Sequence, residues 1–131
     1  IMTRGDFTKV YGLDQWNEDE ETLVVEGPLD SLFLPNCLAM AGSDLDLRFL
    51  NKEKTTVVFD NERRNKEIVK RIISTIDKGF KVCLWPDYVT QKDVNDMILS
   101  GLSPTKVVDI IKENTYNGLE AKLKMSTWSK I

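Results

Sequence analysis

The hydrophobic and polar positions of this chain form two alternating patterns, which together predict an α/β fold. Four runs of four or five residues are mostly apolar without strict polar alternation, as is typical of strands covered on both faces. The four runs are Thr22 to Val25, Cys37 to Ala41, Thr55 to Phe59 and Lys81 to Trp85. Segments with helical spacing separate several of these runs, so we expect a sheet of four parallel strands flanked by helices.

The clearest helical pattern extends from Asn65 to Lys78. Its apolar residues recur every three or four positions and predict a face that packs against the sheet. These residues are Ile68, Val69, Ile72, Ile73 and Ile76. Gly79 follows as a C-terminal stop, and we expect the polar face with Lys66, Lys70 and Arg71 to be solvated.

Pro28 predicts the start of a short helix, because the missing N–H of proline is not needed at the first helical position. We expect Leu29, Leu32 and Phe33 to pack inward before Pro35 ends this helix.

Two further helices are predicted from their capping residues. Ser43 or Asp44 is expected to cap a helix through Phe49, in which Asp46 lies in the first turn. Ser103 precedes a proline and opens another helix near the end of the chain. Its inward positions are Val107, Val108, Ile110 and Ile111.

The composition agrees with a single globular domain and excludes several kinds of chemistry. The chain has 131 residues, of which 41% are hydrophobic and 30% charged. It has no histidine, which excludes Ser-His-Asp and Cys-His catalysis, and its two cysteines lie in apolar runs. The net charge of −3 argues against a chain that holds nucleic acid alone through a wide basic face. Carboxylate chemistry remains.

Acidic residues follow two of the predicted strands directly. Glu26 comes after the first strand, and Asp60 and Glu62 come after the third. Parallel strands present their carboxyl ends to one crevice, so we expect these acids to meet around a cation. Carboxylate oxygens suit Mg²⁺ or Mn²⁺. Gly27 allows close approach of a ligand, and the helix that starts after it offers free N–H groups to an anion.

A further polar cluster follows the fourth predicted strand. It contains Asp87, Asp93, Asn95 and Asp96. We expect it to reach the same edge of the sheet, because the strand before it is parallel to the others.

The motifs in this order resemble the Toprim domain, and in detail the primases of T-even-type bacteriophages, which share this domain with bacterial DnaG-type primases. The motifs are Glu26 to Asp30, Phe59 to Glu62, Leu84 to Asp87 and Lys92 to Asp96, with a similar lead-in from Lys9 to Leu13. The resemblance covers almost the whole chain and implies a Rossmann-like parallel four-stranded sheet.

The resemblance implies a Mg²⁺-dependent RNA polymerase that makes short primers on single-stranded DNA from ribonucleoside triphosphates. It implies that Glu26, Asp60 and Glu62 are catalytic and bind metal, with Asp30 and Asp93 as further candidates. Two positions depart from the bacterial pattern. Glu62 replaces an aspartate, and Asn95 replaces an acid in the last motif; Asp96 and Asp87 are candidates to compensate for that loss.

The resemblance also suggests the organisation and partners of the protein. Residues 1–21 are expected to lead into a Toprim catalytic domain at residues 22–114, and residues 115–131 form a basic tail. Basic residues upstream of the first motif hold the nucleotide in these primases, so Lys9 and Arg4 are candidates here, with Gly27.

The chain begins at Ile1, and we expect it to be the C-terminal catalytic part of a longer protein. The missing N-terminal zinc-binding part and a replicative helicase are the expected partners. We expect the protein in the cytoplasm of an infected bacterial host.

Two other classes of function stay open. A Toprim nuclease or topoisomerase would use the same acids to cleave DNA. Cleavage through a covalent link needs a tyrosine, and Tyr11, Tyr88 and Tyr116 have no supporting motif. A binding-only module would use the acids to hold a structural cation or a partner. The isolated chain is a candidate for this behaviour, because the resemblance implies that template-binding parts are missing.

The last residues combine apolar and basic positions. The apolar side is expected to dock on the core, and we hypothesise that Lys122, Lys124 and Lys130 contact DNA or the helicase.

Overall fold

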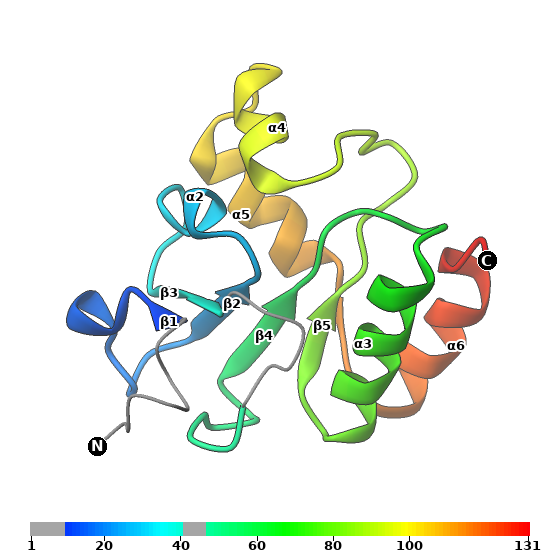
Figure 1. The fold of residues 1–131 in the computed structure, drawn as a ribbon, viewed down its shortest axis with the longest axis horizontal. Coiled ribbons are helices and arrows are strands. Elements are labelled where there is room, and N and C mark those ends of the chain that lie inside the picture. Colours follow the sequence, from blue (N-terminus) through cyan, green and yellow to red (C-terminus); the bar gives the residue numbers. More distant parts are fainter. Residues whose placement is uncertain (1–9, 41–46) are drawn as a thin grey trace.

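The computed structural model describes residues 10–40 and 47–131, which form one six-stranded mixed sheet between two layers of helices. The strand order is β1-β3-β2-β4-β5-β6 (Figure 1). The strands are β1 (Val10–Tyr11), β2 (Thr22–Val25), β3 (Cys37–Met40), β4 (Thr55–Val58), β5 (Lys81–Cys83) and β6 (Thr115–Tyr116). The helices are the 3₁₀ turn η1 (Leu13–Gln15), α2 (Pro28–Ser31), α3 (Lys66–Asp77), α4 (Val94–Leu99), α5 (Pro104–Glu113) and α6 (Gly118–Trp128).

The four predicted strands are present and parallel to one another, which confirms the α/β class. The expectation that the sheet has only four strands is wrong, because β1 and β6 add antiparallel pairs at its two edges. Each of these edge strands has two residues, which is too short to produce a hydrophobic pattern in the sequence.

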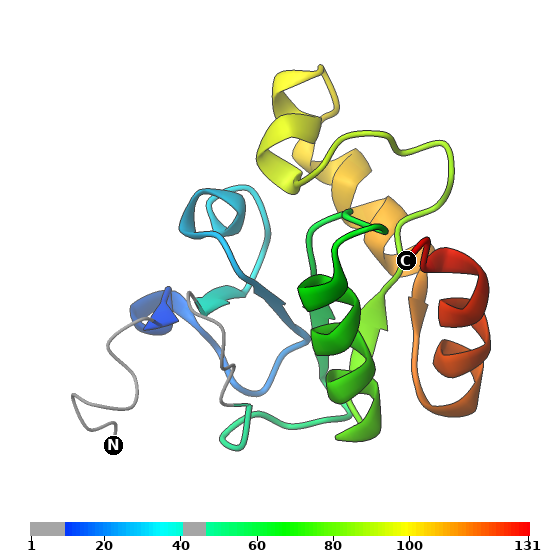
Figure 2. The same ribbon diagram turned by 45° about the vertical axis from the view of Figure 1, so that its right-hand side comes forward.

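The register of the sheet sends alternate residues into two separate cores. Val24 lies beside Val57, which lies beside Val82, and all three side chains face the layer of α3 and α6. Val25 and Val58 face the opposite layer, which contains α4 and α5. Figures 1 and 2 show α3 and α6 side by side on their face of the sheet. Coverage on both faces explains why the strands lack polar alternation.

Helix α3 starts where the sequence predicts, because the side chain of Asn65 accepts hydrogen bonds from the N–H groups of Glu67 and Ile68. Two expectations for this helix are wrong. Ile73 is 44% exposed rather than packed inward. Arg71 is not simply solvated, because it forms an ion pair with Glu26.

Helix α2 also differs from its expected packing. Leu29 and Leu32 are 61% and 75% exposed, whereas Asp30 is 6% exposed. The helix is a single turn, so only one of its side chains can face the protein interior, and that position belongs to the aspartate.

The helix predicted to end at Phe49 would begin outside the described residues. Asp44 and Asp46 also lie outside them. Leu47 to Leu50 form a turn in which the N–H of Leu50 donates to the carbonyl of Leu47. Helix α5 is confirmed, with Ser103 as its N-cap.

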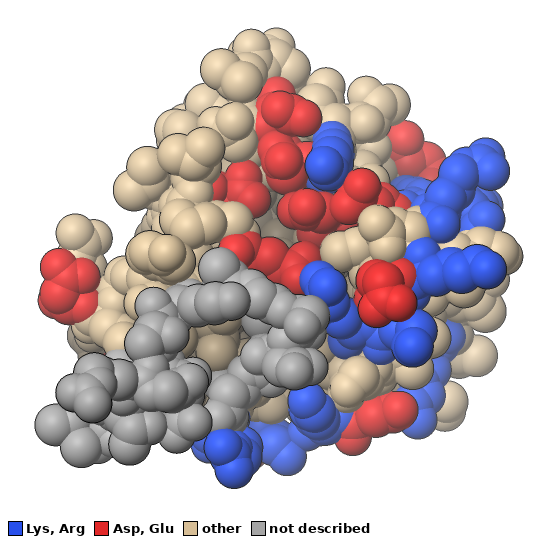
Figure 3. Space-filling view, in the orientation of Figure 1, with Lys and Arg blue, Asp and Glu red and all other residues tan. Residues whose placement is uncertain are grey.

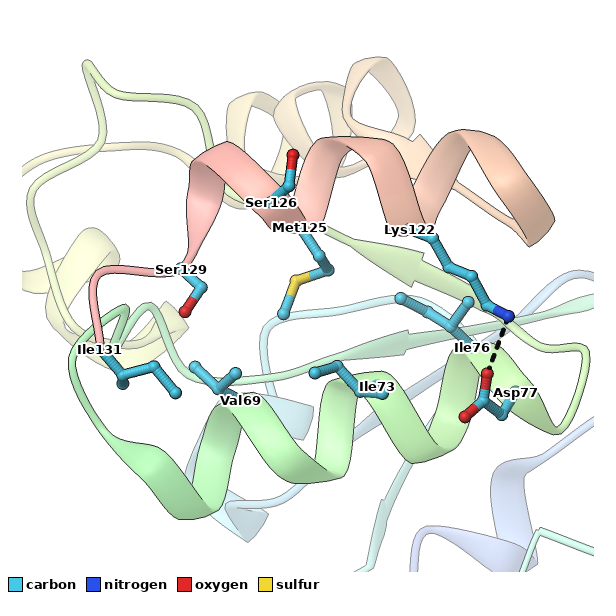
Figure 4. Close-up of a pocket in the computed structure, with 9 residues that line it drawn as sticks. All are labelled: Val69, Ile73, Ile76, Asp77, Lys122, Met125, Ser126, Ser129 and Ile131. Atoms are coloured by element: carbon cyan, nitrogen blue, oxygen red, sulfur yellow. Dashed lines mark ion pairs between the residues drawn. The ribbon is translucent and has the colours of Figure 1, made fainter.

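The C-terminal residues pack along α3 and leave a groove of about 490 Å³ between α3 and α6 (Figure 4). Val69 and Ile73 line one wall, Met125 lines the other, and Lys122 pairs with Asp77 at 3.1 Å at one end. Met125 and Trp128 are buried, so this part of the apolar side docks on the core as expected. The expectation is wrong for Leu119 and Leu123, which are 73% and 64% exposed. The groove contains none of the predicted metal ligands. Every helix of the described residues is too short or too polar to cross a membrane.

Gly12 positions the lead-in segment against the sheet. Its φ of 96° favours glycine, and a Cβ at this position would lie 2.7 Å from the carbonyl oxygen of Cys37. We expect Gly12→Ala to lower the free energy of unfolding by about 2–3 kcal/mol, because it combines backbone strain with a clash. Gly101→Ala is the matched control. Its φ is 112°, but an added Cβ would have no contact within 4 Å, so this substitution should lower the free energy of unfolding by only about 1 kcal/mol. Urea denaturation measures both, and equal losses would contradict the clash.

Candidate metal centre

The acids predicted from the sequence lie at the carboxyl ends of the parallel strands, as the α/β topology requires. Glu26 follows β2, and Asp60 and Glu62 follow β4. Asp93 caps the N-terminus of α4, where its carboxylate accepts a hydrogen bond from the N–H of Asp96 at 2.8 Å. Figure 3 shows acidic side chains gathered around a hollow in this face of the molecule, with lysines and arginines toward α3 and α6.

Three of these carboxylates approach one another closely. Each of Asp30, Asp60 and Asp93 has an oxygen that lies within 4.8 Å of an oxygen of the other two. Two negative charges at such a distance repel by roughly 3 kcal/mol at an effective dielectric constant of about 20. The group therefore requires a proton or a cation. Three carboxylates in this arrangement fit a hard divalent cation such as Mg²⁺ or Mn²⁺.

Asp30 is held by a backbone hydrogen bond and fits closely beside a glycine. Its Oδ1 accepts a hydrogen bond of 2.8 Å from the backbone N–H of Asn95. On the other side, a Cβ on Gly27 would lie 3.0 Å from Oδ2, so the glycine leaves room for the carboxylate. Burial raises the pKa of Asp30 and outweighs the hydrogen bond from Asn95, and the charges of Asp93 and Asp96 raise it further.

Asp60 shows the strongest electrostatic effect of the site. Partial burial, followed by the charges of Asp30, Glu26, Asp93 and Glu62, raises its pKa from 3.8 to about 7. The carboxyl group is therefore partly protonated near neutral pH when no cation is bound. A carboxylate in this state exchanges its proton for a metal ion readily as the pH rises.

Glu26 and Glu62 lie on an adjoining cavity rather than within the close group. The cavity has a volume of about 380 Å³ and is open to solvent. It is lined by Glu26, Asp60, Glu62, Asn65, Glu67, Ile68 and Arg71. Burial raises the pKa of Glu26, against the opposing effect of the Arg71 guanidinium. Glu62 lies 4.0 Å from the ammonium group of Lys92.

The remaining candidates take other positions. The carboxylate of Asp87 is 96% exposed and pairs with Arg63 at 2.8 Å. Asn95 contributes its backbone to Asp30, and Asp96 is exposed in the first turn of α4. Lys9 and Arg4 lie outside the described residues. The residues that line the cavity within the described ranges include no tyrosine.

Asn61 connects the two loops that carry Asp60 and Asp93, a role that the sequence analysis missed. Its backbone N–H donates to the carbonyl of Lys92 at 2.6 Å, and its side-chain amide donates to the carbonyls of Val89 and Gln91 at 2.9 and 3.1 Å. A short polar residue between two acids gives no sequence signal for such a contact.

We expect Asn61→Ala to lower the free energy of unfolding by about 2–3 kcal/mol, because it leaves the carbonyls of Val89 and Gln91 without their donor. It should also weaken Mn²⁺ binding, since Asp93 loses its fixed position. Gln91→Ala keeps the carbonyl acceptor and should change stability by less than about 0.5 kcal/mol. Urea denaturation and Mn²⁺ titration measure the two effects, and similar results for both variants would contradict this role.

The chain is an α/β domain whose acids gather at the carboxyl edge of its parallel strands, which is where open α/β sheets bind ligands. No protein-family model matches the chain. The chain is similar to the DNA primase of Enterobacteria phage T4, with 39% identity over 127 residues. This alignment covers 95% of the chain and 37% of the phage protein, so the chain spans well under half the length of that relative. The similarity supports a relationship between the chain and part of a DNA primase.

Proposed function

We propose that this chain is the catalytic part of a DNA primase of the Toprim type, which makes short RNA primers on single-stranded DNA with a divalent cation. The observation that carries the proposal is the approach of the Asp30, Asp60 and Asp93 carboxylates within 4.8 Å at the edge where parallel strands end. The 39% identity to a phage primase supports the same reaction class.

Each acid has a distinct part in the proposed reaction. Asp30, Asp60 and Asp93 would hold Mg²⁺ or Mn²⁺, because their oxygens are the hard ligands that these ions prefer. The bound cation would lower the pKa of a primer 3′ hydroxyl and neutralise charge on the incoming triphosphate. Glu26 and Glu62 line the neighbouring cavity, which is large enough for the phosphates of a nucleotide.

Asp60 links metal binding to pH in this proposal. With a pKa of about 7 in the metal-free site, its carboxyl group must lose a proton before it can bind a cation. Affinity for Mg²⁺ therefore rises as the pH increases through this range.

The longer protein would supply what the net charge of −3 does not, namely a basic surface for the template. The proposed partners are single-stranded DNA, ribonucleoside triphosphates, a replicative helicase and an N-terminal zinc-binding part. Lys9 and Arg4 remain candidates for nucleotide binding. Lys122, Lys124 and Lys130 remain candidates for contact with DNA or helicase.

The test uses the longer protein with a single-stranded template, labelled ribonucleotides and Mg²⁺. We expect short RNA products that disappear when the cation is chelated and that increase when the helicase is added. Parallel incubation with supercoiled DNA should produce no nicks. Nicked DNA without RNA products would favour the nuclease class, and neither product would favour a binding-only module.

A further inference from the structure

One cation faces the acidic centre from α3. The Nη1 atom of Arg71 donates to Oε2 of Glu26, and the arginine lines the same cavity as Asp60 and Glu62. The two side chains are only 27% and 14% exposed, so the pair is partly shielded from water. Lys70, the preceding residue, is exposed to solvent, so a basic residue on α3 does not have to be partly buried.

The acids of the centre are unequally neutralised. Glu26 has the guanidinium of Arg71 beside it, whereas Asp30, Asp60 and Asp93 have no ion-pair partner among the described residues. Glu26 nevertheless lines the same cavity as Asp60. A cation bound by the three aspartates that also takes Oε2 of Glu26 would have to displace Arg71 from that oxygen.

The guanidinium is suited to a second anion once it leaves Glu26. Its planar set of donors matches phosphate as well as carboxylate, and both interactions are strengthened by charge. The cavity that it lines opens to solvent beside the proposed metal ligands. Phosphates that share the cation with these acids would lie within reach of Arg71.

We propose that Arg71 is a phosphate-binding residue that pairs with Glu26 until a divalent cation takes over that carboxylate. The inference rests on the proposed function, because it needs a cation at the acidic centre. It adds a residue that binds the triphosphate and explains why a cation of the chain itself lies within an acidic site.

The first experiment measures Mn²⁺ affinity by electron paramagnetic resonance for the native chain, Arg71→Gln, Arg71→Lys and Lys70→Gln. Arg71→Gln removes the competitor and should bind Mn²⁺ about five-fold more tightly or better. Arg71→Lys keeps the charge and should remain within about two-fold of the native chain. Lys70→Gln makes the same charge change on an exposed position and should also remain within about two-fold.

The second experiment measures binding of inorganic tripolyphosphate by calorimetry at saturating Mn²⁺. Arg71→Gln should bind it about ten-fold more weakly than the native chain, and Lys70→Gln should not differ from it. One substitution would thus strengthen the binding of one ligand and weaken that of the other. Structural damage weakens both, so it cannot produce this result.

Three outcomes would overturn the inference. They are weaker Mn²⁺ binding by Arg71→Gln, equal effects of Arg71→Gln and Lys70→Gln, and no tripolyphosphate binding by the native chain with Mn²⁺ bound. The proposed function fails in a different way. Mn²⁺ binding that is unchanged in Asp60→Asn would place the cation outside the acidic centre, whatever the Arg71 variants do.

Discussion

Replacing Asp60 with asparagine should weaken Mn²⁺ binding by about 100-fold or more and reduce primer synthesis by the longer protein to a similar extent. Asp60 is central to the carboxylate group, and its charge interacts with four other acids. The amide keeps the shape of the side chain but supplies neither the charge nor both oxygens. Glu53→Gln is the control, because Glu53 is an exposed acid that precedes β4, at the opposite end of the strand. It should leave both measurements unchanged.

The same substitution should stabilise the metal-free chain. The pKa of Asp60 is about 7 in the folded chain, whereas its ordinary value is 3.8. Between these pH values the folded state therefore binds more protons than the unfolded state. Stability is therefore lost as the pH rises from about 4 to 7. Asp60→Asn has no ionisable group there and avoids this loss. After allowance for screening of a half-buried group, we expect a gain of about 1–2 kcal/mol at pH 8 and little at pH 4.

Urea denaturation at the two pH values, without divalent cations, measures this difference. A gain that is equal at both pH values, or larger at pH 4, would contradict the electrostatic account of Asp60. Activity loss without a change in Mn²⁺ affinity would contradict its role as a metal ligand.

Trp85→Ala should cause the largest loss of stability, about 3–5 kcal/mol. The side chain is 1% exposed, and its indole N–H donates to the carbonyl of Phe59 at 2.9 Å. Its own carbonyl accepts hydrogen bonds from Arg63 and Trp128. Trp85, which follows β5, is thus bonded to Phe59, which follows β4 and precedes Asp60. Its loss removes both packing and a hydrogen bond.

Two controls separate the contributions of Trp85. Trp85→Phe keeps most of the buried area but leaves the Phe59 carbonyl unpaired, so it should cost about 1–3 kcal/mol. Tyr88→Ala removes an aromatic ring that is 67% exposed and should change stability by less than about 0.5 kcal/mol. Thermal or urea denaturation measures all three. A small loss in Trp85→Ala would contradict the view that the indole supports the site.

The parallel strands were predictable because each is a continuous apolar run covered on both faces. The positions of Glu26, Asp60 and Glu62 after the ends of β2 and β4 were also predictable, because these acids follow the apolar runs in the sequence. The edge strands were not predictable, since two-residue pairings depend on neighbours that are distant along the chain. Their positions are set by tertiary contacts rather than by local pattern.

The finer arrangement of the site depends on contacts between loops. Asp30 was a secondary candidate, yet it is buried at the centre because the single turn of α2 directs it inward. Asp93 joins it because Asn61 holds the loop before α4 in place. A signal for Arg71 was present, since it lies three residues after Ile68 and four before Thr75, both of which are buried. Helical spacing places Arg71 beside the core-facing residues, but its charge led us to expect a side chain exposed to solvent.

A crystal structure of the chain with Mn²⁺, in which anomalous scattering locates the ion, tests the proposed metal site at Asp30, Asp60 and Asp93. We expect a peak between the carboxylates of Asp30, Asp60 and Asp93, at about 2.2 Å from their oxygens. Loss of the peak in Asp60→Asn would identify the ion as site-bound. No peak at this edge of the sheet, or a peak only at exposed acids such as Glu18 to Glu21, would contradict the account.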